Sequence, residues 1–524
     1  MKEYDLISIG TGSAMSVVDA MLQANPNLRV AVVDKDDPGG ICLTRGCIPS
    51  KLLLYPAEMI RTIEMANEFG IDVQLHEIDF NKIMERMRHH IYEEIEMIRN
   101  GLTESENIDY YHDAAEFVEP YTLKVGGNSN NVTIRAKMIF LCTGSKPIIP
   151  PIKGLEDISY HTSDSILAID RLPESIAIVG GGYIGAEYGH FFSSMGSHIT
   201  IVGKNKRFLP HEEAEISELA KRKISKYMTV ITNSEVIEVN NSNTTADIAE
   251  ADGNATSSKE TRYKKKSEQK GSKKKKLVIA RDMISGERTT ITAEEVLIAA
   301  GRGPNTDILH PERAGIKTDE NGWIVVNEYL ETSQPNVWAF GDANGVYPFK
   351  HKANYEAELM YYNTTLGKKV EEAEKKKTYS KLKKDYHAVP HAVFAYPEVA
   401  AVGLGEGEAL AKYGENNILI GIARYEDTAK GIAMGIKDCF VKVIVKADDL
   451  EVIGAHIIGP HASILIQEII NIMYTQQERT MKPILSAMHI HPALSEVVQR
   501  SVSSLMPPQQ YHHLIAEHYR LSSD

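Results

Sequence analysis

Two copies of one glycine-bearing pattern constrain the fold of this chain more than any other feature. In each copy, an apolar strand-like run leads through a glycine-rich turn into a helical stretch, and a second strand-like run follows. This layout is typical of dinucleotide-binding units, in which the pyrophosphate lies on the helix N-terminus. The sequence therefore predicts an α/β fold with two Rossmann-like dinucleotide-binding domains.

The first copy opens the chain and contains a strand-like run (6–9), Gly10, Gly12, Ser13, a helical stretch (about 14–23), a second run (30–33) and Asp34. Gly10 allows a tight turn, and Gly12 lets the backbone approach a pyrophosphate. Asp34 is suited to accept hydrogen bonds from a ribose. Met15 stands where the pattern usually has its third glycine, so a plain parallel β-unit stays open for this copy taken alone.

The second copy has the complete spacing, with Gly180, Gly182 and Gly185 between its two strands. Because two such units are present, the sequence predicts two bound dinucleotides. Gly203 follows the second strand where an NAD site usually has an acid, and Lys204 comes next. The missing acid and the nearby cations favour NADPH, although a solvated loop explains the same residues equally well.

Further glycines end other strand-like runs, and each alone would read as an ordinary loop. They are Gly144, Gly301 and Gly341, the last directly before Asp342. Beside two dinucleotide-binding units, we assign them as candidate cofactor-binding residues.

Composition excludes several classes of protein. The 524 residues are 43% apolar and 25% charged, unlike a fibrous or wholly disordered chain. Four cysteines argue against a secreted disulfide scaffold, and no apolar run reaches the ~18 residues of a membrane span. The first residues show no signal-peptide pattern, so we expect a cytoplasmic protein without a membrane partner. The net charge of −13 argues against nucleic acid as the main partner.

Two lysine-rich segments interrupt the chain. Residues 240–276 contain almost no apolar side chains, so we expect a disordered surface insertion within the second dinucleotide domain. Its end, 259–276, holds ten Lys or Arg and two Glu, a net charge of +8. Such a charge run also suits a tether to nucleic acid, an acidic partner or a membrane surface. The second segment, 368–384, is expected to be an exposed helix or linker.

The pattern changes again from about residue 387 onward. Several β-rich runs precede one amphipathic helical stretch, ASILIQEIINIMY. This indicates a separate α+β domain at the C-terminal end.

Cys42 and Cys47 carry the strongest chemical signal, because they are close together in a chain expected to be cytoplasmic. A zinc site needs two more ligands at comparable spacing, whereas Cys142 and Cys439 stand alone in apolar runs. We therefore predict a cycling dithiol/disulfide and no metal, with zinc or two buried structural thiols as the weaker alternatives.

The motif GGICLTRGCIPSK around these cysteines resembles that of the FAD-dependent pyridine nucleotide–disulfide oxidoreductases. Phe340–Asp342 and the run HIHPALSE at 489–496 also fall in the family's order, and the resemblance covers nearly the whole chain. It implies FAD in the first unit, with Gly341 and Asp342 on the flavin side, and NAD(P)H in the second. It also implies a homodimer, built through the C-terminal domain, that shares its active site across the interface.

Domain boundaries follow from the same resemblance. We expect a split FAD-binding domain (1–155 and 307–385), an NAD(P)-binding domain (156–306), a dimerisation domain (386–505) and a C-terminal tail (506–524).

The resemblance also implies residue roles. Cys47 would be the sulfur next to the flavin, and Cys42 the sulfur that exchanges with a small dithiol or disulfide substrate. His491 would be the base, supplied to the partner subunit's site, with Glu496 holding its imidazole. Lys51 and Glu187 would form the ion pair beside the flavin.

The substrate stays open among family members. Dihydrolipoyl dehydrogenase is the first choice, because it is the commonest role for this motif set. A mycothione-reductase-like or other low-molecular-weight disulfide reductase using NADPH is the alternative, favoured by Ala493 and the run KHKANYEAE. Arg45, between the cysteines, would attract an anionic substrate or lower a thiol pKa, unless it is a plain surface residue. A binding module acting through the polybasic insertion is the remote alternative.

Overall fold

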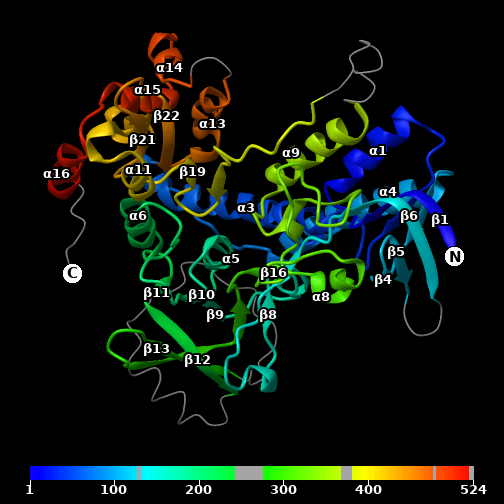
Figure 1. Cartoon of the computed structure of the whole chain (residues 1–524). Coiled ribbons are helices and arrows are strands. Elements are labelled where there is room, and N and C mark those ends of the chain that lie inside the picture. Colours follow the sequence, from blue (N-terminus) through cyan, green and yellow to red (C-terminus); the bar gives the residue numbers. More distant parts are fainter. Residues whose placement is uncertain (127–130, 242–274, 367–379, 476–478, 519–524) are drawn as a thin grey trace.

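The computed structural model describes residues 1–126, 131–241, 275–366, 380–475 and 479–518 (Figure 1). The first unit is built on a sheet with the order β3-β2-β1-β6-β5-β4, and β17 pairs in parallel with β6. Its strands are β1 (Lys2–Ile9), β2 (Val30–Val33), β3 (Ile108–Tyr111), β4 (Ala115–Glu119), β5 (Thr122–Val125), β6 (Val132–Leu141) and β17 (Val337–Ala339). Strand β17 comes from a distant part of the chain, so this sheet joins two separate sequence segments.

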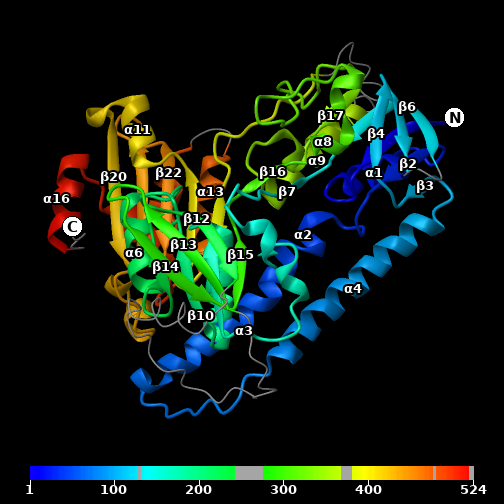
Figure 2. The same ribbon diagram turned by 90° about the horizontal axis from the view of Figure 1, so that it is seen from below.

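Helices of the first unit place its functional residues. They are α1 (Ala14–Ala24), α2 (Gly40–Thr44), α3 (Cys47–Met65), α4 (Phe80–Glu104) and α9 (Lys350–Tyr361). Every residue of β2 is buried, as expected for an apolar run in a parallel sheet covered on both faces. Helices α3 and α4 lie side by side (Figure 2), and α3 also contacts α5 (Tyr183–Met195) of the next unit.

The second unit is a parallel sheet with the order β11-β10-β9-β15-β8. Its strands are β8 (His161–Thr162), β9 (Ser175–Val179), β10 (His198–Val202), β11 (Thr229–Ile231) and β15 (Glu295–Ile298). Helices α5 and α6 (Ala214–Ile224) accompany it, together with an antiparallel sheet of β12 (Ser234–Asn241), β13 (Lys276–Asp282) and β14 (Arg288–Ala293). The prediction of two dinucleotide-binding α/β units is confirmed.

The lysine-rich insertion was predicted too wide at both ends. Strand β12 continues to Asn241 and β13 begins at Lys276, and these two residues pair across the sheet. Lys276 is 5% exposed and its Nζ lies 2.5 Å from Glu295 Oε2, so it belongs to the folded unit. Residues 242–274 lie outside the described residues, as do 368–379 of the second lysine-rich segment.

The third unit is an antiparallel sheet with the order β18-β19-β22-β21-β20, which confirms the α+β prediction. Its strands are β18 (His391–Val393), β19 (Val399–Gly403), β20 (Ile418–Arg424), β21 (Phe440–Lys446) and β22 (Val452–Ile458). Its helices are α11 (Glu406–Tyr413), α12 (Ala429–Ala433), α13 (Ala462–Met473), α14 (Lys482–Ser486) and α15 (Ser495–Ser503). The amphipathic stretch predicted from the sequence is α13, which packs on β22 and β19.

The predicted C-terminal tail contains a packed helix, α16 (Pro508–His518). Tyr511 is 1% exposed and its hydroxyl donates a hydrogen bond to Glu215 of α6. Glu215 also accepts a hydrogen bond from Lys442, whose buried ammonium contacts Glu213 and Glu406 as well, at 2.5–2.6 Å. A buried charge needs such partners, so this cluster fixes the second unit, the third unit and α16 to one another.

None of the helices in these described ranges is long and apolar enough to span a membrane.

Candidate active site

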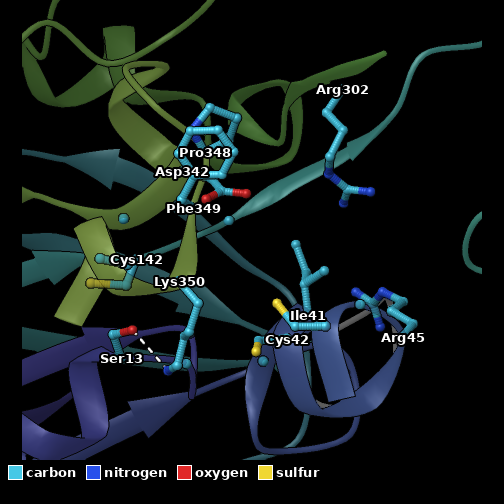
Figure 3. A pocket seen from close by; sticks show the side chains of 18 of the residues that line it. Ser13, Ile41, Cys42, Arg45, Cys142, Arg302, Asp342, Pro348, Phe349 and Lys350 are labelled. Atoms are coloured by element: carbon cyan, nitrogen blue, oxygen red, sulfur yellow. Dashed lines mark hydrogen bonds between the residues drawn. The ribbon is translucent and has the colours of Figure 1, made fainter. Parts of the chain in front are cut away.

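A cavity of about 730 Å³ opens where the three units meet (Figure 3). It is lined by residues of the first glycine turn, of α2 and α3, of α5, of α9 and of the strand β18 and helix α13. The cavity therefore collects most of the residues predicted for FAD and for the dithiol. They are Gly10, Gly12, Ser13, Asp34, Cys42, Cys47, Lys51, Gly144, Glu187, Gly341 and Asp342.

The first glycine turn lies at one end of this cavity. Gly10 has φ +103°, and a Cβ there would lie 2.1 Å from the carbonyl oxygen of Cys142, so a larger residue does not fit. Helix α1 has no side-chain cap at Ser13 and no acid in its first turn. An uncapped helix N-terminus beside a glycine turn fits the diphosphate of FAD, because it offers free N–H donors to an anion.

Asp34 is already engaged in the chain itself. Its Oδ2 accepts hydrogen bonds from the Thr11 N–H at 2.9 Å and from the Thr11 hydroxyl at 2.5 Å, and its Oδ1 accepts one from the Asp36 N–H. Asp34 therefore holds the glycine turn in shape. Sequence reasoning missed Thr11, since nothing in the motif demands a threonine there. Binding of a ribose by Asp34 stays a prediction.

Cys42 and Cys47 lie on two helices separated by a break. Cys42 is half-buried on the short helix α2, and Cys47 is exposed as the first residue of α3; both are free thiols. The pKa of Cys47 is lowered to about 7, chiefly by its hydrogen bond with Cys42 and also by the charge of Lys51. The same hydrogen bond and burial raise the pKa of Cys42. Position at a helix N-terminus also favours a thiolate.

Lys51 lies one helical turn after Cys47 on α3. Its Nζ is 2.8 Å from Glu187 Oε2 of α5, and it also lies 4.3 Å from the ring centroid of Phe394. The Phe394 N–H donates a hydrogen bond to Glu187 Oε1 at 3.1 Å. The ion pair implied by the family resemblance is therefore present in the structure, and all three units contribute to it. Sequence reasoning missed Phe394, an ordinary strand-end residue.

The turn at Gly341 and Asp342 is held by a buried ion pair that the sequence analysis also missed. Glu356 Oε2 accepts the Gly341 N–H at 2.7 Å, and Lys352 Nζ donates to the Gly341 carbonyl at 2.9 Å. Lys352 and Glu356 contact each other at 3.0 Å and are 2% and 0% exposed. Their spacing of four residues on α9 was the available signal. Asp342 in turn accepts a hydrogen bond from Ser145 Oγ at 2.6 Å.

The second glycine turn belongs to the second unit; its three glycines do not line this cavity, but Tyr183 and Ile184 between them do. Gly180 has φ +127°, and a Cβ there would lie 2.1 Å from the Ala299 carbonyl oxygen. Gly182 begins α5, and a Cβ at Gly185 would meet the Gly180 carbonyl oxygen at 2.2 Å. Gly180 and Gly185 are thus required sterically, whereas a Cβ at Gly182 would meet no atom within 4 Å. Binding of a second dinucleotide at the N-terminus of α5 stays a prediction.

The strand ends around this second turn differ in exposure. Gly203 follows β10 and is buried against Gly181; a Cβ there would lie 3.3 Å from the Gly181 backbone, so the acid of an NAD site would need Gly181 to move by a few tenths of an ångström. Lys204 is exposed, as are Lys206 and Arg207. Gly301 has φ +121° and does not line the large cavity.

His491 and Glu496 form a pair outside the cavity of their own chain. His491 Nδ1 lies 2.9 Å from Glu496 Oε1, and the Ala493 N–H donates to the other carboxylate oxygen. The His491 side chain is 68% exposed. Met488 and Ile490 beside it are 101% and 78% exposed, an unusual position for large apolar side chains. The structure therefore brings the histidine to its carboxylate but not to Cys42.

Arg45 does not present a free charge to the cavity. Its Nη2 lies 2.6 Å from Asp36 Oδ2, and its Nε lies 3.1 Å from Asp164 Oδ2. With two acids beside it, its charge is already matched, so the predicted attraction of an anionic substrate has no support here.

The thiol acidity gives a direct prediction. Because its pKa is lowered to about 7, Cys47 is half thiolate near neutral pH, and the thiolate is the reactive form. We expect the rate of alkylation of Cys47 by iodoacetamide to rise with a midpoint near pH 7. In Lys51→Met the midpoint should move upward, because the lysine charge stabilises the thiolate. Mass spectrometry of the labelled peptide measures both; a midpoint near pH 9 in the unsubstituted protein contradicts the prediction.

Comparison with known proteins agrees with this geometry. Residues 4–357 match the family described as pyridine nucleotide-disulphide oxidoreductase, and 389–502 match its dimerisation domain. Mycothione reductase of Mycobacterium tuberculosis is 33% identical over 517 residues, covering 96% of this chain and 100% of that protein. Dihydrolipoyl dehydrogenase of Bacillus subtilis is 30% identical over 511 residues, covering 95% and 96%.

The fold has a solved counterpart in the HOCl-induced flavoprotein disulfide reductase RclA of Escherichia coli in its Cu(II) complex. The TM-score is 0.77 at 24% identity, over 96% of this chain and 99% of that one. The match to the dimerisation domain supports a homodimer. Members of the matched family bind FAD and NAD(P)H, and the chain belongs to this family, the pyridine nucleotide–disulphide oxidoreductases.

Proposed function

We propose that this protein is a dithiol/disulfide oxidoreductase in which Cys42 and Cys47 carry an electron pair between NAD(P)(H) and a small sulfur substrate. The position of Cys47 carries the proposal: it begins α3 beside Lys51, and its pKa is lowered to about 7 by its hydrogen bond with Cys42. A thiolate held in this way beside a cofactor-sized cavity is suited to redox exchange.

FAD, when bound, supplies two-electron transfer between the nicotinamide and the cysteine pair. The chain's own part is thiol exchange. In the reducing direction, Cys42 gives its proton to His491 of the partner subunit as its sulfur attacks one sulfur of the substrate disulfide; the released thiolate then takes up that proton. Cys47 then attacks the sulfur of Cys42, which releases the second substrate thiolate and leaves a Cys42–Cys47 disulfide. The sum is a disulfide plus NAD(P)H and one proton, giving two thiols and NAD(P)⁺.

His491 is the proton carrier in this proposal, acting in the partner subunit. Its Nδ1 is held by Glu496, so Nε2 is left to exchange a proton with a substrate sulfur. The histidine is exposed and flanked by the exposed side chains of Met488 and Ile490, which suits burial against a second copy. The active site is therefore completed across the interface of the homodimer.

Our first assignment is dihydrolipoyl dehydrogenase: the substrate is a dihydrolipoyl group, which the enzyme oxidises while it reduces NAD. A specific observation favours the second candidate, an NADPH-linked reductase of a low-molecular-weight disulfide such as that of the mycothione type. Gly203 replaces the acid after β10, and the exposed Lys204, Lys206 and Arg207 suit a 2′-phosphate. A reducing compartment such as the cytoplasm suits either role.

The deciding experiment is steady-state reduction of NAD and of NADP by dihydrolipoamide, using purified flavin-loaded protein. Rapid reduction of NAD supports the dihydrolipoyl dehydrogenase assignment. Failure with both, combined with reduction of the flavin by NADPH, supports the disulfide reductase. Absence of turnover with dihydrolipoamide and also with every low-molecular-weight disulfide tested, although NAD(P)H still reduces the flavin, would contradict the dithiol function itself. The remote alternative, a binding module, rests on the polybasic run 259–276, of which 259–274 lie outside the described residues.

A further inference from the structure

Lys350 is a lysine of the cavity wall that takes no part in the proposed thiol steps, although its charge acts to lower the pKa of Cys42. It is the first residue of α9, is half-buried, and reaches toward the first glycine turn (Figure 3). Its Nζ lies 2.9 Å from Ser13 Oγ, a contact between residues 337 positions apart in the chain. Asn354, one turn further along α9, accepts a hydrogen bond from the same hydroxyl at 2.9 Å. Helix α9 thus presents two polar side chains to the start of α1.

Among the described residues, no carboxylate lies within 4.0 Å of the Lys350 ammonium to match its charge. Its one polar contact there is the neutral Ser13 hydroxyl. Burial of an unmatched ammonium is unfavourable, so the position favours an anionic partner. Lys352, two residues on, shows the contrast, because its buried charge is matched by Glu356.

The N-terminus of α1 presents donors to the same place. No side chain caps this helix, because the Ser13 hydroxyl is turned to α9 instead, and its first turn carries no acid. The first N–H groups of a helix lack internal partners and carry partial positive charge. An anion beside Ser13 would therefore meet backbone donors from one side and the Lys350 ammonium from the other.

We propose that Lys350 binds the diphosphate of FAD at the N-terminus of α1. The inference rests on the FAD of the family and not on the proposed disulfide chemistry. Cys42 lines the same cavity, so an anionic group on the disulfide substrate is the other source of a matching charge. The contact of Lys350 with Ser13, at the Gly10–Gly12 turn, favours the diphosphate.

The test is FAD binding by the reversibly stripped full-length protein, measured by the change in flavin fluorescence. In Lys350→Met, affinity for FAD should fall about tenfold or more at low ionic strength, the usual effect of losing a charge-assisted hydrogen bond. Lys350→Arg should recover most of it. Lys137→Met is the matched control, because Lys137 lies in the same unit with its side chain 88% exposed, and it should bind FAD normally.

Two further readouts distinguish a contact with the diphosphate from a general loss of folding. The preference for ADP over adenosine, as competitors of FAD, should shrink in Lys350→Met, whereas a general loss of folding would weaken both competitors together. Affinity for FAD should also become less dependent on salt. Unchanged FAD affinity in Lys350→Met overturns the proposal. Unchanged FAD affinity with a raised KM for a carboxylate-bearing disulfide, but not for lipoamide, would assign Lys350 to the substrate instead.

Discussion

In Cys42→Ser we expect disulfide turnover to be lost, by on the order of 10³-fold or more, while FAD stays bound and NAD(P)H still reduces it. The reason is that a serine hydroxyl cannot form the mixed disulfide, whereas the cavity around the cofactor keeps its other residues. Stopped-flow absorbance separates the two steps, because flavin reduction and thiol release are followed at different wavelengths.

Cys439→Ala serves as the control for this substitution. Cys439 is 5% exposed in the core of the third unit and should support normal turnover once the protein is folded. Substantial disulfide turnover by Cys42→Ser would remove the dithiol from the mechanism. Loss of flavin binding would show instead that Cys42 is needed for the structure of the cavity.

In His491→Gln we expect the thiol steps to slow by roughly 10²-fold or more, with flavin reduction by NAD(P)H unchanged. Glutamine keeps a polar group near Glu496 but cannot carry a proton at neutral pH. His513→Gln is the matched control, since His513 is also exposed, at 75%, and also lies near a carboxylate. A near-normal rate in His491→Gln would exclude this residue as the proton carrier.

A mixing experiment tests whether the site is shared between subunits. Refolding Cys42→Ser with His491→Gln produces mixed dimers, in which one site combines an intact Cys42 with an intact His491 only if the histidine acts across the interface. If half the dimers are mixed and each has one of two sites intact, activity should return to about a quarter of the unsubstituted value. No recovery, with mixed dimers demonstrated, would place the histidine and the cysteines in the same subunit.

The parts of the fold that the sequence predicted well are those set by local patterns. The buried run of β2 and the helix after Gly12 were expected at nearly their observed bounds, because apolar runs and glycine turns act over a few residues. The pairing of Lys51 with Glu187 came from family resemblance, since nothing local links residues 136 positions apart.

The missed residues share a physical reason. Thr11 is needed because the Asp34 carboxylate folds back onto the turn, and Lys350 matters because α9 packs against α1. Both contacts depend on how distant segments pack, which no period or spacing encodes. Helix α16 was missed for the same reason. The buried Tyr511 donates its hydroxyl hydrogen bond to Glu215, which Lys442 also contacts, and both of these residues belong to other units.

The end of the lysine-rich segment was misjudged because a charge run looks alike in a loop and on a strand. Lys276 continues the run of lysines, yet its side chain is buried against Glu295. The composition of a segment does not separate a buried lysine from its exposed neighbours, whereas the pairing of Lys276 within the sheet does.

The pairing of Asn241 with Lys276 has a consequence for how this chain tolerates added sequence. The strands β12 and β13 pair there as antiparallel neighbours, so the described residues on the two sides of 242–274 are held together at one point of the sheet. The entropy of closing a flexible loop grows only with the logarithm of its length, about 0.6 kcal/mol for each doubling. An insertion between β12 and β13 can therefore lengthen during evolution with little loss in the free energy of folding, and without moving the two glycine turns or the dithiol.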